Sequence, residues 1–224
     1  MEKALIREIF LSIQGEGPYI GEEQLFVRFC GCNLNCKYCD TDFIASRSKE
    51  YTPDEFVNII NSYNKNLTIS LTGGEPLLSA KFLSEVLPKI KQVGHKIYLE
   101  TNGTLPEQLK KIFPYIDVIA ADIKLSSATG ENYNQQNIYD FFDIAQGKTL
   151  FAKIVFDNSV KEEEILFAAK IAKKYDVELI LQPKMDKDNF AASTQEIEDI
   201  FFKFKKLYDN VRLIPQMHKF LNIR

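Results

Sequence analysis

Three cysteines, Cys32, Cys36 and Cys39, follow Gly31 at the spacing C-x3-C-x2-C. Thiolates this close in sequence can bind one metal centre, but structural zinc and a fully ligated iron–sulfur cluster each take four protein ligands. A 4Fe–4S cluster held by three cysteines would leave one iron with an open coordination position. The motif therefore predicts a cluster that can bind a small molecule and take part in chemistry.

Two other roles for these thiols are open. A zinc site would need a fourth ligand, and the chain's histidines, His95 and His218, are distant in sequence. The C-x-x-C pair of Cys36 and Cys39 is also found in redox-active thioredoxin-like proteins, although a third cysteine just upstream is not expected there. The combined spacing favours the cluster. The fourth cysteine, Cys30, ends an apolar run and is expected to be a small buried residue.

The segments that must position this loop alternate between strand and helix patterns. Apolar runs predict strands at residues 4–10, 24–29, 67–71, 96–99, 116–121, 150–156, 177–181 and 211–214. Apolar residues at helical spacing predict helices at residues 79–93, 106–112, 139–145, 160–175 and 194–207. A further helix begins at Thr52, an N-cap followed by proline and two acids. Residues 125–136 are polar and are expected to form a loop.

Strands alternating with helices are typical of parallel βαβ units. About six or seven of the predicted strands are counted as members of these parallel units, which is fewer than an eight-stranded barrel needs. We therefore expect an α/β protein with one domain over residues 1–224. Its fold would be a partial, open (β/α) barrel with about six parallel strands and reduced helical decoration.

Polar and glycine-rich segments follow several of the predicted strands. In parallel α/β folds the carboxyl ends of the strands line the active site. The segments at residues 73–76, 100–103, 122–124 and 182–183 should therefore converge on the cysteine loop. Residues 12–18 contain Gly15, Gly17 and Pro18, which predict a loop after the first strand whose backbone can approach a ligand. Arg28, at the end of an apolar strand, is either a surface charge or a carboxylate-binding group.

Composition excludes several classes of protein. The 224 residues carry a net charge of −3 without a long run of one sign, so no nucleic-acid-binding surface is indicated. No apolar run reaches the length of a membrane span, and the N-terminus lacks a signal-peptide pattern. Four cysteines, three of them clustered, do not form a disulfide framework. We expect a cytoplasmic protein, and a homodimer is the default assembly.

The cysteine motif and the segment Gly73-Gly74-Glu75-Pro76 together resemble the radical S-adenosylmethionine (SAM) enzymes. In that superfamily the open iron binds the amino and carboxylate groups of SAM and passes an electron that cleaves its C–S bond. The chain further resembles the 7-carboxy-7-deazaguanine synthase family. The segments that carry this second resemblance span nearly the whole chain, at residues 12–17, 26–29, 31–34, 39–43, 72–76, 100–104 and 218–223.

This resemblance implies a lyase of queuosine and 7-deazapurine biosynthesis, a pathway that supplies tRNA modification. Its substrate would be 6-carboxy-5,6,7,8-tetrahydropterin, and its product 7-carboxy-7-deazaguanine with loss of ammonia. The implied cofactors are a 4Fe–4S cluster, SAM and Mg2+, with an electron donor such as flavodoxin or ferredoxin. The radical is generated on SAM at the cluster, so no side chain is assigned as catalytic.

The resemblance also implies roles for individual positions. The cluster ligands would be Cys32, Cys36 and Cys39, and Thr41 would bind Mg2+. The implied SAM contacts are Tyr38, Cys39, Asp40, Gly74, Glu75, Asp122, Ile123, Lys124, Gln182, Pro183, Lys184 and Met185. The implied substrate contacts are Ile13, Gln14, Gly15, Arg28, Thr72 and Arg224. His218 is a further candidate for the site, whereas His95 is expected at the surface end of a helix.

The sequence departs from the family pattern in two places. The segment at residues 182–186 is one residue longer than its counterpart in the family. Arg224 ends the chain where a family member can have a proline against the substrate, and its free carboxylate could serve equally. Two other functions are alternatives to this lyase activity. One is a radical SAM enzyme that activates a glycyl-radical partner, and the other is a non-enzymatic iron–sulfur or zinc module with a fourth protein ligand.

Overall fold

The computed structural model describes residues 2–39, 48–64, 66–186 and 189–223. The strands are β1 (Ala4–Ile13), β2 (Glu23–Phe29), β3 (Lys49–Tyr51), β4 (Thr68–Gly73), β5 (Lys96–Thr101), β6 (Val118–Asp122), β7 (Thr149–Phe156), β8 (Glu178–Pro183), β9 (Met185–Asp186), β10 (Asn189–Phe190) and β11 (Val211–Leu213). The α-helices are α1 (Pro53–Asn61), α2 (Ala80–Gln92), α3 (Pro106–Ile112), α4 (Ser126–Thr129), α5 (Gln135–Ala145), α6 (Glu162–Tyr175), α7 (Thr194–Leu207) and α8 (Met217–Leu221). Short 3-10 turns are η1 (Gly17–Tyr19), η3 (Pro76–Ser79) and η4 (Phe113–Tyr115).

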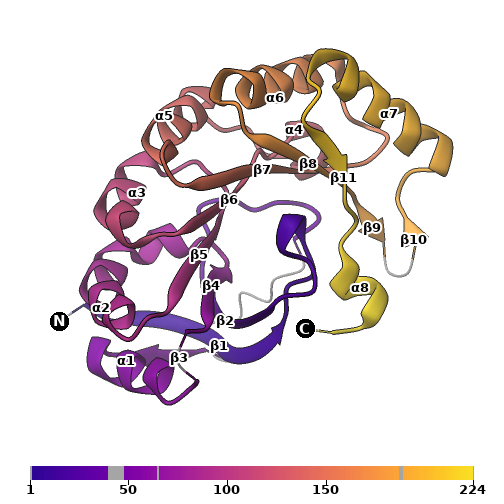
Figure 1. Ribbon diagram of the computed structural model, residues 1–224. Helices are drawn as coiled ribbons and strands as arrows, with labels where there is room; N and C mark the ends of the chain where they lie inside the picture. The colour runs from indigo at the N-terminus through magenta and orange to yellow at the C-terminus, as the bar shows by residue number, and fades with distance from the viewer. Residues whose placement is uncertain (1, 40–47, 65, 187–188, 224) are drawn as a thin grey trace.

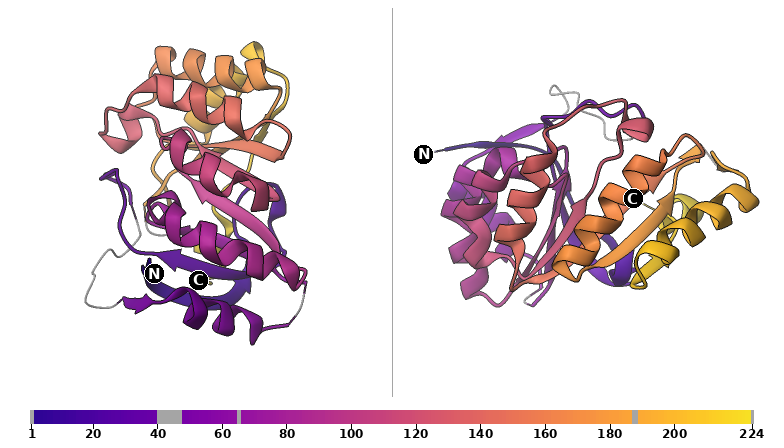
Figure 2. Two further views of the ribbon diagram at one scale, coloured as in Figure 1. Left: turned by 90° about the vertical axis from the view of Figure 1, so that its left-hand side faces the viewer. Right: turned by 90° about the horizontal axis from the view of Figure 1, so that it is seen from above.

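The described strands form a nine-stranded sheet in the order β11-β8-β7-β6-β5-β4-β2-β1-β3, beside the small β9–β10 hairpin. Strands β2, β4, β5, β6, β7, β8 and β11 run parallel. The sheet curves into an open barrel with helices along its convex side, as Figure 1 and Figure 2 show. The expected partial (β/α) barrel is confirmed, with seven parallel strands where about six were expected.

The N-terminal edge of the sheet differs from the sequence-based expectation. β1 runs antiparallel to β2, and β3 runs antiparallel to β1. The prediction that the first strand ends at residue 10 is wrong, because pairing with β2 continues to Ile13, opposite Glu23. The break therefore begins at Gln14, whose backbone bonds with Gly21 and Glu22 close the turn around η1.

Local signals placed most of the predicted helix ends to within two residues, but α5 begins at Gln135 and not at the predicted residue 139. Thr52 caps α1 by accepting from the backbone N–H of Glu55, and the Glu55 carboxylate accepts from the backbone N–H of Thr52 in return. Ser193 and Glu196 form the same capping box at the start of α7. Two helices were not predicted, α4 within the stretch expected to be a loop and α8 near the C-terminus.

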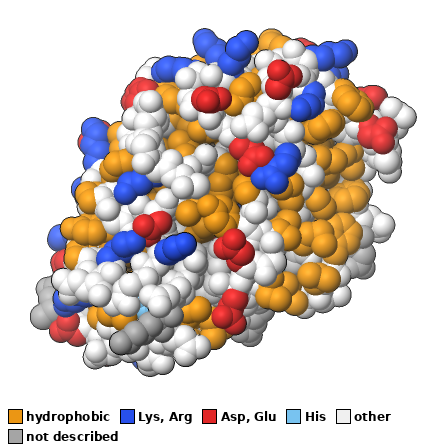
Figure 3. All heavy atoms as spheres, viewed as in Figure 1, with side chains coloured by type: hydrophobic (Ala, Val, Ile, Leu, Met, Phe, Trp, Pro, Cys, Tyr) orange, Lys and Arg blue, Asp and Glu red, His pale blue; other side chains and the backbone are white. Residues whose placement is uncertain are grey.

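The hydrophobic core lies between the sheet and the helices on its convex side, where the large side chains of Phe56, Phe82 and Phe142 are fully buried. A second, smaller cluster fills the inside of the barrel around Tyr98 and Phe151. Basic and acidic side chains are interspersed with hydrophobic ones over the face seen in Figure 3. Among the described residues, no helix has the length and apolar character to cross a membrane.

Two single-residue expectations need correction. His95 is not at the surface: it is 1% exposed, and its Nδ1 lies 3.3 Å from the carbonyl oxygen of Leu67. Cys30 is half-buried rather than buried, because it lies beyond the end of β2, where its backbone N–H donates to Leu5.

Candidate active site

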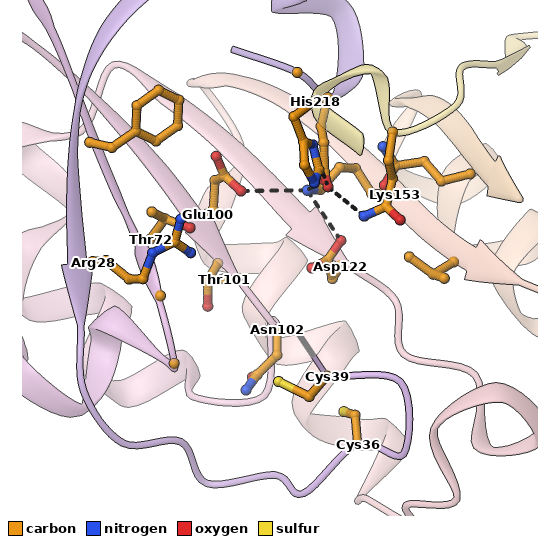
Figure 4. Close-up of a pocket in the computed structure, with 18 of the residues that line it drawn as sticks. Arg28, Cys36, Cys39, Thr72, Glu100, Thr101, Asn102, Asp122, Lys153 and His218 are labelled. Atoms are coloured by element: carbon orange, nitrogen blue, oxygen red, sulfur yellow. Dashed lines mark hydrogen bonds and ion pairs between the residues drawn. The ribbon is translucent and has the colours of Figure 1, made fainter. Parts of the chain in front are cut away.

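A cavity of about 660 Å³ opens at the carboxyl ends of the parallel strands. Residues from all four polar segments line it together with the cysteines, as expected. Figure 4 shows two of these segments, with Asn102 and Asp122 on the same side of the site as Cys36 and Cys39. The sequence-predicted residues that line the cavity are Ile13, Gln14, Gly15, Arg28, Cys32, Cys36, Tyr38, Cys39, Thr72, Gly74, Asp122, Lys124, Gln182 and His218.

Other predicted residues do not line this cavity. They are Glu75, Ile123, Pro183, Lys184 and Met185. Lys184 instead pairs with Asp157 at 3.1 Å. Asp40, Thr41 and Arg224 lie outside the described residues, so their predicted roles remain predictions.

The cysteine loop is anchored by its backbone. The N–H of Lys37 donates to the carbonyl of Thr129 at the end of α4, and the N–H of Cys39 donates to Cys36. The Sγ of Cys32 lies 3.4 Å from the backbone nitrogen of Leu34, within reach of a weak N–H···S bond. The unpredicted helix α4 thus has a clear role, because it holds the middle of the loop.

The three thiols fit a cluster better than a single ion. All three line the same cavity, and none forms a disulfide. Among the described residues, no three His, Cys, Asp or Glu side chains are grouped closely enough to hold one metal ion. Burial raises the pKa of Cys32, and it raises the pKa of Cys36 to about 11. The free thiols of Cys32 and Cys36 are therefore protonated at neutral pH, so their binding to a cluster releases protons.

Glu75 has a structural role that the sequence did not reveal. It is 1% exposed, and its carboxylate accepts hydrogen bonds from the backbone N–H of Leu77, the hydroxyl of Thr101 and the backbone N–H of Asn102. Burial raises the pKa of Glu75 to about 7, and these three donors act in the opposite direction. Glu75 therefore joins the turn after β4 to the end of β5.

Polar groups beside the cysteine loop remain available to a ligand. Lys124 donates to Asp122 at 2.9 Å and lies 5.5 Å from the centre of the Tyr38 ring. Gln182 is fully buried at the cavity wall, and neither its amide nitrogen nor its amide oxygen has a hydrogen-bond partner among the described residues. A buried amide without partners costs stability unless a ligand or water completes its bonds.

The opposite wall comes from β1, β2 and β4. Arg28 pairs with Glu8 at 2.9 Å and lies beside Thr72 in the β2–β4 register. Gln14 is 3% exposed and donates its amide to Glu100 and to Gln24. This wall therefore contains one cation, Arg28, together with the amide of Gln14 and the hydroxyl of Thr72. Such a set of groups suits a ligand that carries both a carboxylate and a polar ring.

Sequence reasoning missed an ionic cluster at the bottom of the cavity. Lys153, on β7, is 3% exposed. Its Nζ lies 2.6 Å from Glu16, 3.6 Å from Glu100 and 3.7 Å from Asp122 (Figure 4). The one available signal was a lone lysine within the apolar strand Thr149–Phe156. Its partners could not be inferred, because Glu16 is 137 positions away.

The C-terminal segment covers one side of the cavity. The backbone N–H of Met217 donates to Gly15 at 2.9 Å, and the amide of Gln216 donates to Glu16 at 2.7 Å. A Cβ at Gly15 would lie 2.6 Å from the Cβ of His218, so only glycine permits this approach. His218 lines the cavity, with its Nδ1 3.8 Å from Glu16.

The fold and this site agree with the comparisons to known proteins. The family model described as the radical SAM superfamily matches residues 26–191. The chain is therefore a radical SAM protein, a class that uses a 4Fe–4S cluster and SAM.

Proteins similar in sequence show which family of this class the chain belongs to. A 7-carboxy-7-deazaguanine synthase from Archaeoglobus fulgidus is 37% identical over 99% of this chain and 100% of its own length. One from Methanocaldococcus jannaschii is 34% identical over 98% of this chain and 100% of its own length. The chain belongs to the 7-carboxy-7-deazaguanine synthase family and is a carbon–nitrogen lyase of queuosine and deazapurine biosynthesis. The crystal structure of QueE from Escherichia coli shares the fold, with a TM-score of 0.65 at 18% identity over 96% of this chain and 95% of that chain.

Proposed function

We propose that the cavity binds 6-carboxy-5,6,7,8-tetrahydropterin and SAM side by side and releases 7-carboxy-7-deazaguanine and ammonia. The observation that carries this proposal is the sharing of one cavity by the three cysteines, the Tyr38–Lys124 group and the Gln14–Arg28 wall. When bound, the cluster and SAM supply the radical that removes a hydrogen atom from the substrate. The protein supplies binding and orientation.

The two walls would bind different ligands. Tyr38, Asp122 and Lys124 lie next to the cysteines and offer a ring, a carboxylate and an ammonium group to SAM. The unpartnered amide of Gln182 would complete its hydrogen bonds on the same ligand. Gly74 permits close approach there, because it has no side chain.

The pterin would lie against the other wall. Its carboxylate would pair with Arg28, which would then share its cationic charge between the substrate and Glu8. The backbone and amide groups of Ile13, Gln14 and Gly15 would bind the ring, with Thr72 beside them. The C-terminal segment from Gln216 onward would shield the ring from water, because it is already bonded to the loop after β1.

Three further features belong to the proposal. Mg2+ would be held through Thr41, since hydroxyl and carboxylate oxygens are the ligands that this cation prefers. A flavodoxin or ferredoxin would deliver the electron. The enzyme would be a homodimer.

The deciding experiment is anaerobic turnover. Reconstituted protein is incubated with SAM, reductant and the pterin, with and without Mg2+, and the products are analysed by mass spectrometry. We expect 7-carboxy-7-deazaguanine, with a higher rate in Mg2+. SAM cleavage without a deazaguanine product would instead favour an enzyme that activates a glycyl-radical partner. A cluster whose EPR spectrum does not respond to SAM would favour a non-enzymatic module.

A further inference from the structure

Lys153 is the one charged residue in β7 (Thr149–Phe156), and its side chain points into the barrel rather than toward solvent. Its ammonium group lies among carboxylates from three separate elements: Glu16 after β1, Glu100 on β5 and Asp122 on β6. Figure 4 shows the ammonium between Glu100 and Asp122. The side chain of Lys153 therefore connects β7 to three other parts of the cavity that are distant in sequence.

Each carboxylate has a different set of other partners. Glu100 accepts from Gln14 and from Ser70 through Oε1, which leaves Oε2 facing Lys153. Glu16 accepts from Gln216 through Oε1 and from Lys153 through Oε2. Asp122 is paired with Lys124 through Oδ2. Among the described residues, no other cationic group lies as close to Glu16 or to Glu100 as Lys153 does.

Buried carboxylates need a compensating charge to stay ionised. Burial opposes ionisation of Glu16, but Lys153, with help from His218 and Gln216, holds the pKa of that carboxyl well below its usual range. Burial would likewise lower the pKa of Lys153, and the surrounding carboxylates raise it well above its usual value. Glu16 and Lys153 therefore keep their charges at neutral pH.

We infer that Lys153 is a positioning residue for the pterin, which acts by fixing the carboxylates of Glu16 and Glu100 as hydrogen-bond acceptors at the cavity floor. This inference rests on the proposed substrate. The pterin carries an exocyclic amino group and ring N–H groups, which need acceptors in fixed places. Without the ammonium group, the two carboxylates would repel each other and turn away or take up protons, and both changes remove acceptors from the cavity.

The test measures binding without turnover. Anaerobically reconstituted protein is titrated with the pterin and, separately, with SAM, in the absence of reductant. For Lys153→Gln we expect the dissociation constant of the pterin to rise roughly 10- to 100-fold, the effect of a lost interaction with a charged group. The dissociation constant of SAM should rise by much less, because Lys153 reaches the SAM side of the cavity only through Asp122 at 3.7 Å, and Asp122 keeps its ion pair with Lys124 at 2.9 Å. Lys153→Arg keeps the charge and should recover part of the pterin affinity.

A matched control and a double variant separate positioning from folding. Lys91 also forms an ion pair, with Asp117 at 2.6 Å, but it lies outside the cavity. Lys91→Gln should leave both affinities within about 2-fold of wild type. In Lys153→Gln combined with Glu16→Gln, the loss of pterin affinity should be smaller than the sum of the single losses, because the repulsion is relieved.

Several outcomes would overturn the inference. They are unchanged pterin affinity in Lys153→Gln, equal losses of pterin and SAM affinity, or additive effects in the double variant. If Lys153→Gln fails to fold, Lys153→Arg decides alone: a folded variant with no pterin binding would show that charge is not what matters. A wild-type protein that does not bind the pterin would refute the proposed function instead, so the two failures are distinguishable.

Discussion

Gly74 lies so close to Gly31 that a Cβ on Gly74 would be 1.8 Å from the Gly31 carbonyl oxygen. Backbone bonds from Gly74 to Phe29 and from Glu75 to Gly31 hold the two segments together. Because Gly31 directly precedes Cys32, the turn after β4 sets the position at which the cysteine loop begins. The contact joins the part of the site that would hold the cluster to the part that would bind SAM.

Gly74→Ala should therefore separate the two segments. The added methyl group overlaps backbone atoms that cannot move independently, so we expect loss of most of the bound iron after reconstitution, measured by iron and sulfide content. Gly31→Ala is the matched control. A Cβ on Gly31 would meet open space. The only cost to stability is that an alanine must adopt the positive φ of 87°, which destabilises the fold by about 1–2 kcal/mol. Equal iron content in the two variants would contradict the role given to this contact.

Replacing Cys32, Cys36 or Cys39 singly with Ala should abolish both the cluster and SAM cleavage. With only two thiolates, two of the irons would lack a protein ligand, and we expect the protein not to retain the cluster. The absorbance of reconstituted protein and its iron content provide the measurement. Cys30→Ala should retain full iron content, and loss of iron in that variant would mean that Cys30 is a ligand.

Arg28→Ala should weaken pterin binding and spare SAM binding. Removing one partner of a charge-assisted bond costs about 1.5–3 kcal/mol, which corresponds to roughly 10- to 100-fold in affinity. The dissociation constants of both ligands are measured on reconstituted protein without reductant. Arg212, which pairs with Glu178 outside the cavity, supplies the control variant Arg212→Ala. A pterin affinity unchanged in Arg28→Ala would show that the substrate carboxylate binds elsewhere.

Glu75 should make stability depend on pH. Its pKa is raised to about 7 in the folded state from 4.5, so its neutral form is favoured by folding. Its contribution is fully present below about pH 4.5 and is lost as the pH rises to about 7. The loss amounts to about 3 kcal/mol. Chemical denaturation across this range should show wild type losing stability relative to Glu75→Gln.

The glutamine variant also has a cost that does not depend on pH. Leu77 N–H donates to one carboxylate oxygen and Asn102 N–H donates to the other, so the NH2 group of the glutamine must face one of these two donors. Glu75→Gln should therefore be the less stable protein at low pH. A stability difference that stays constant from pH 4.5 to pH 8 would mean that Glu75 titrates at its ordinary pKa.

The sequence predicted features that depend on neighbouring residues. The N-cap of α1 and the apolar faces of the helices depend on local sequence, and each was found where expected. The order of strands and helices implied that polar segments meet at one edge of the sheet, and the cavity confirms this convergence.

Features set by partners distant in sequence could not be predicted. The extension of β1 to Ile13 depends on its pairing with β2, and no residue inside β1 signals it. The role of Glu75 required knowing that β5 ends directly beside it. Glu16 and Gln216 are 200 positions apart, so the cover over the cavity is visible only in three dimensions.

The open barrel leaves two outermost strands, β3 and β11, and each is only three residues long. Unpaired strand edges invite pairing between molecules, and short edge strands are one way in which proteins limit it. β3 also carries the charged residues Lys49 and Glu50. Charged side chains on an edge strand oppose edge-to-edge pairing with a strand of another molecule. The unclosed barrel should therefore resist aggregation at the concentrations that anaerobic reconstitution requires.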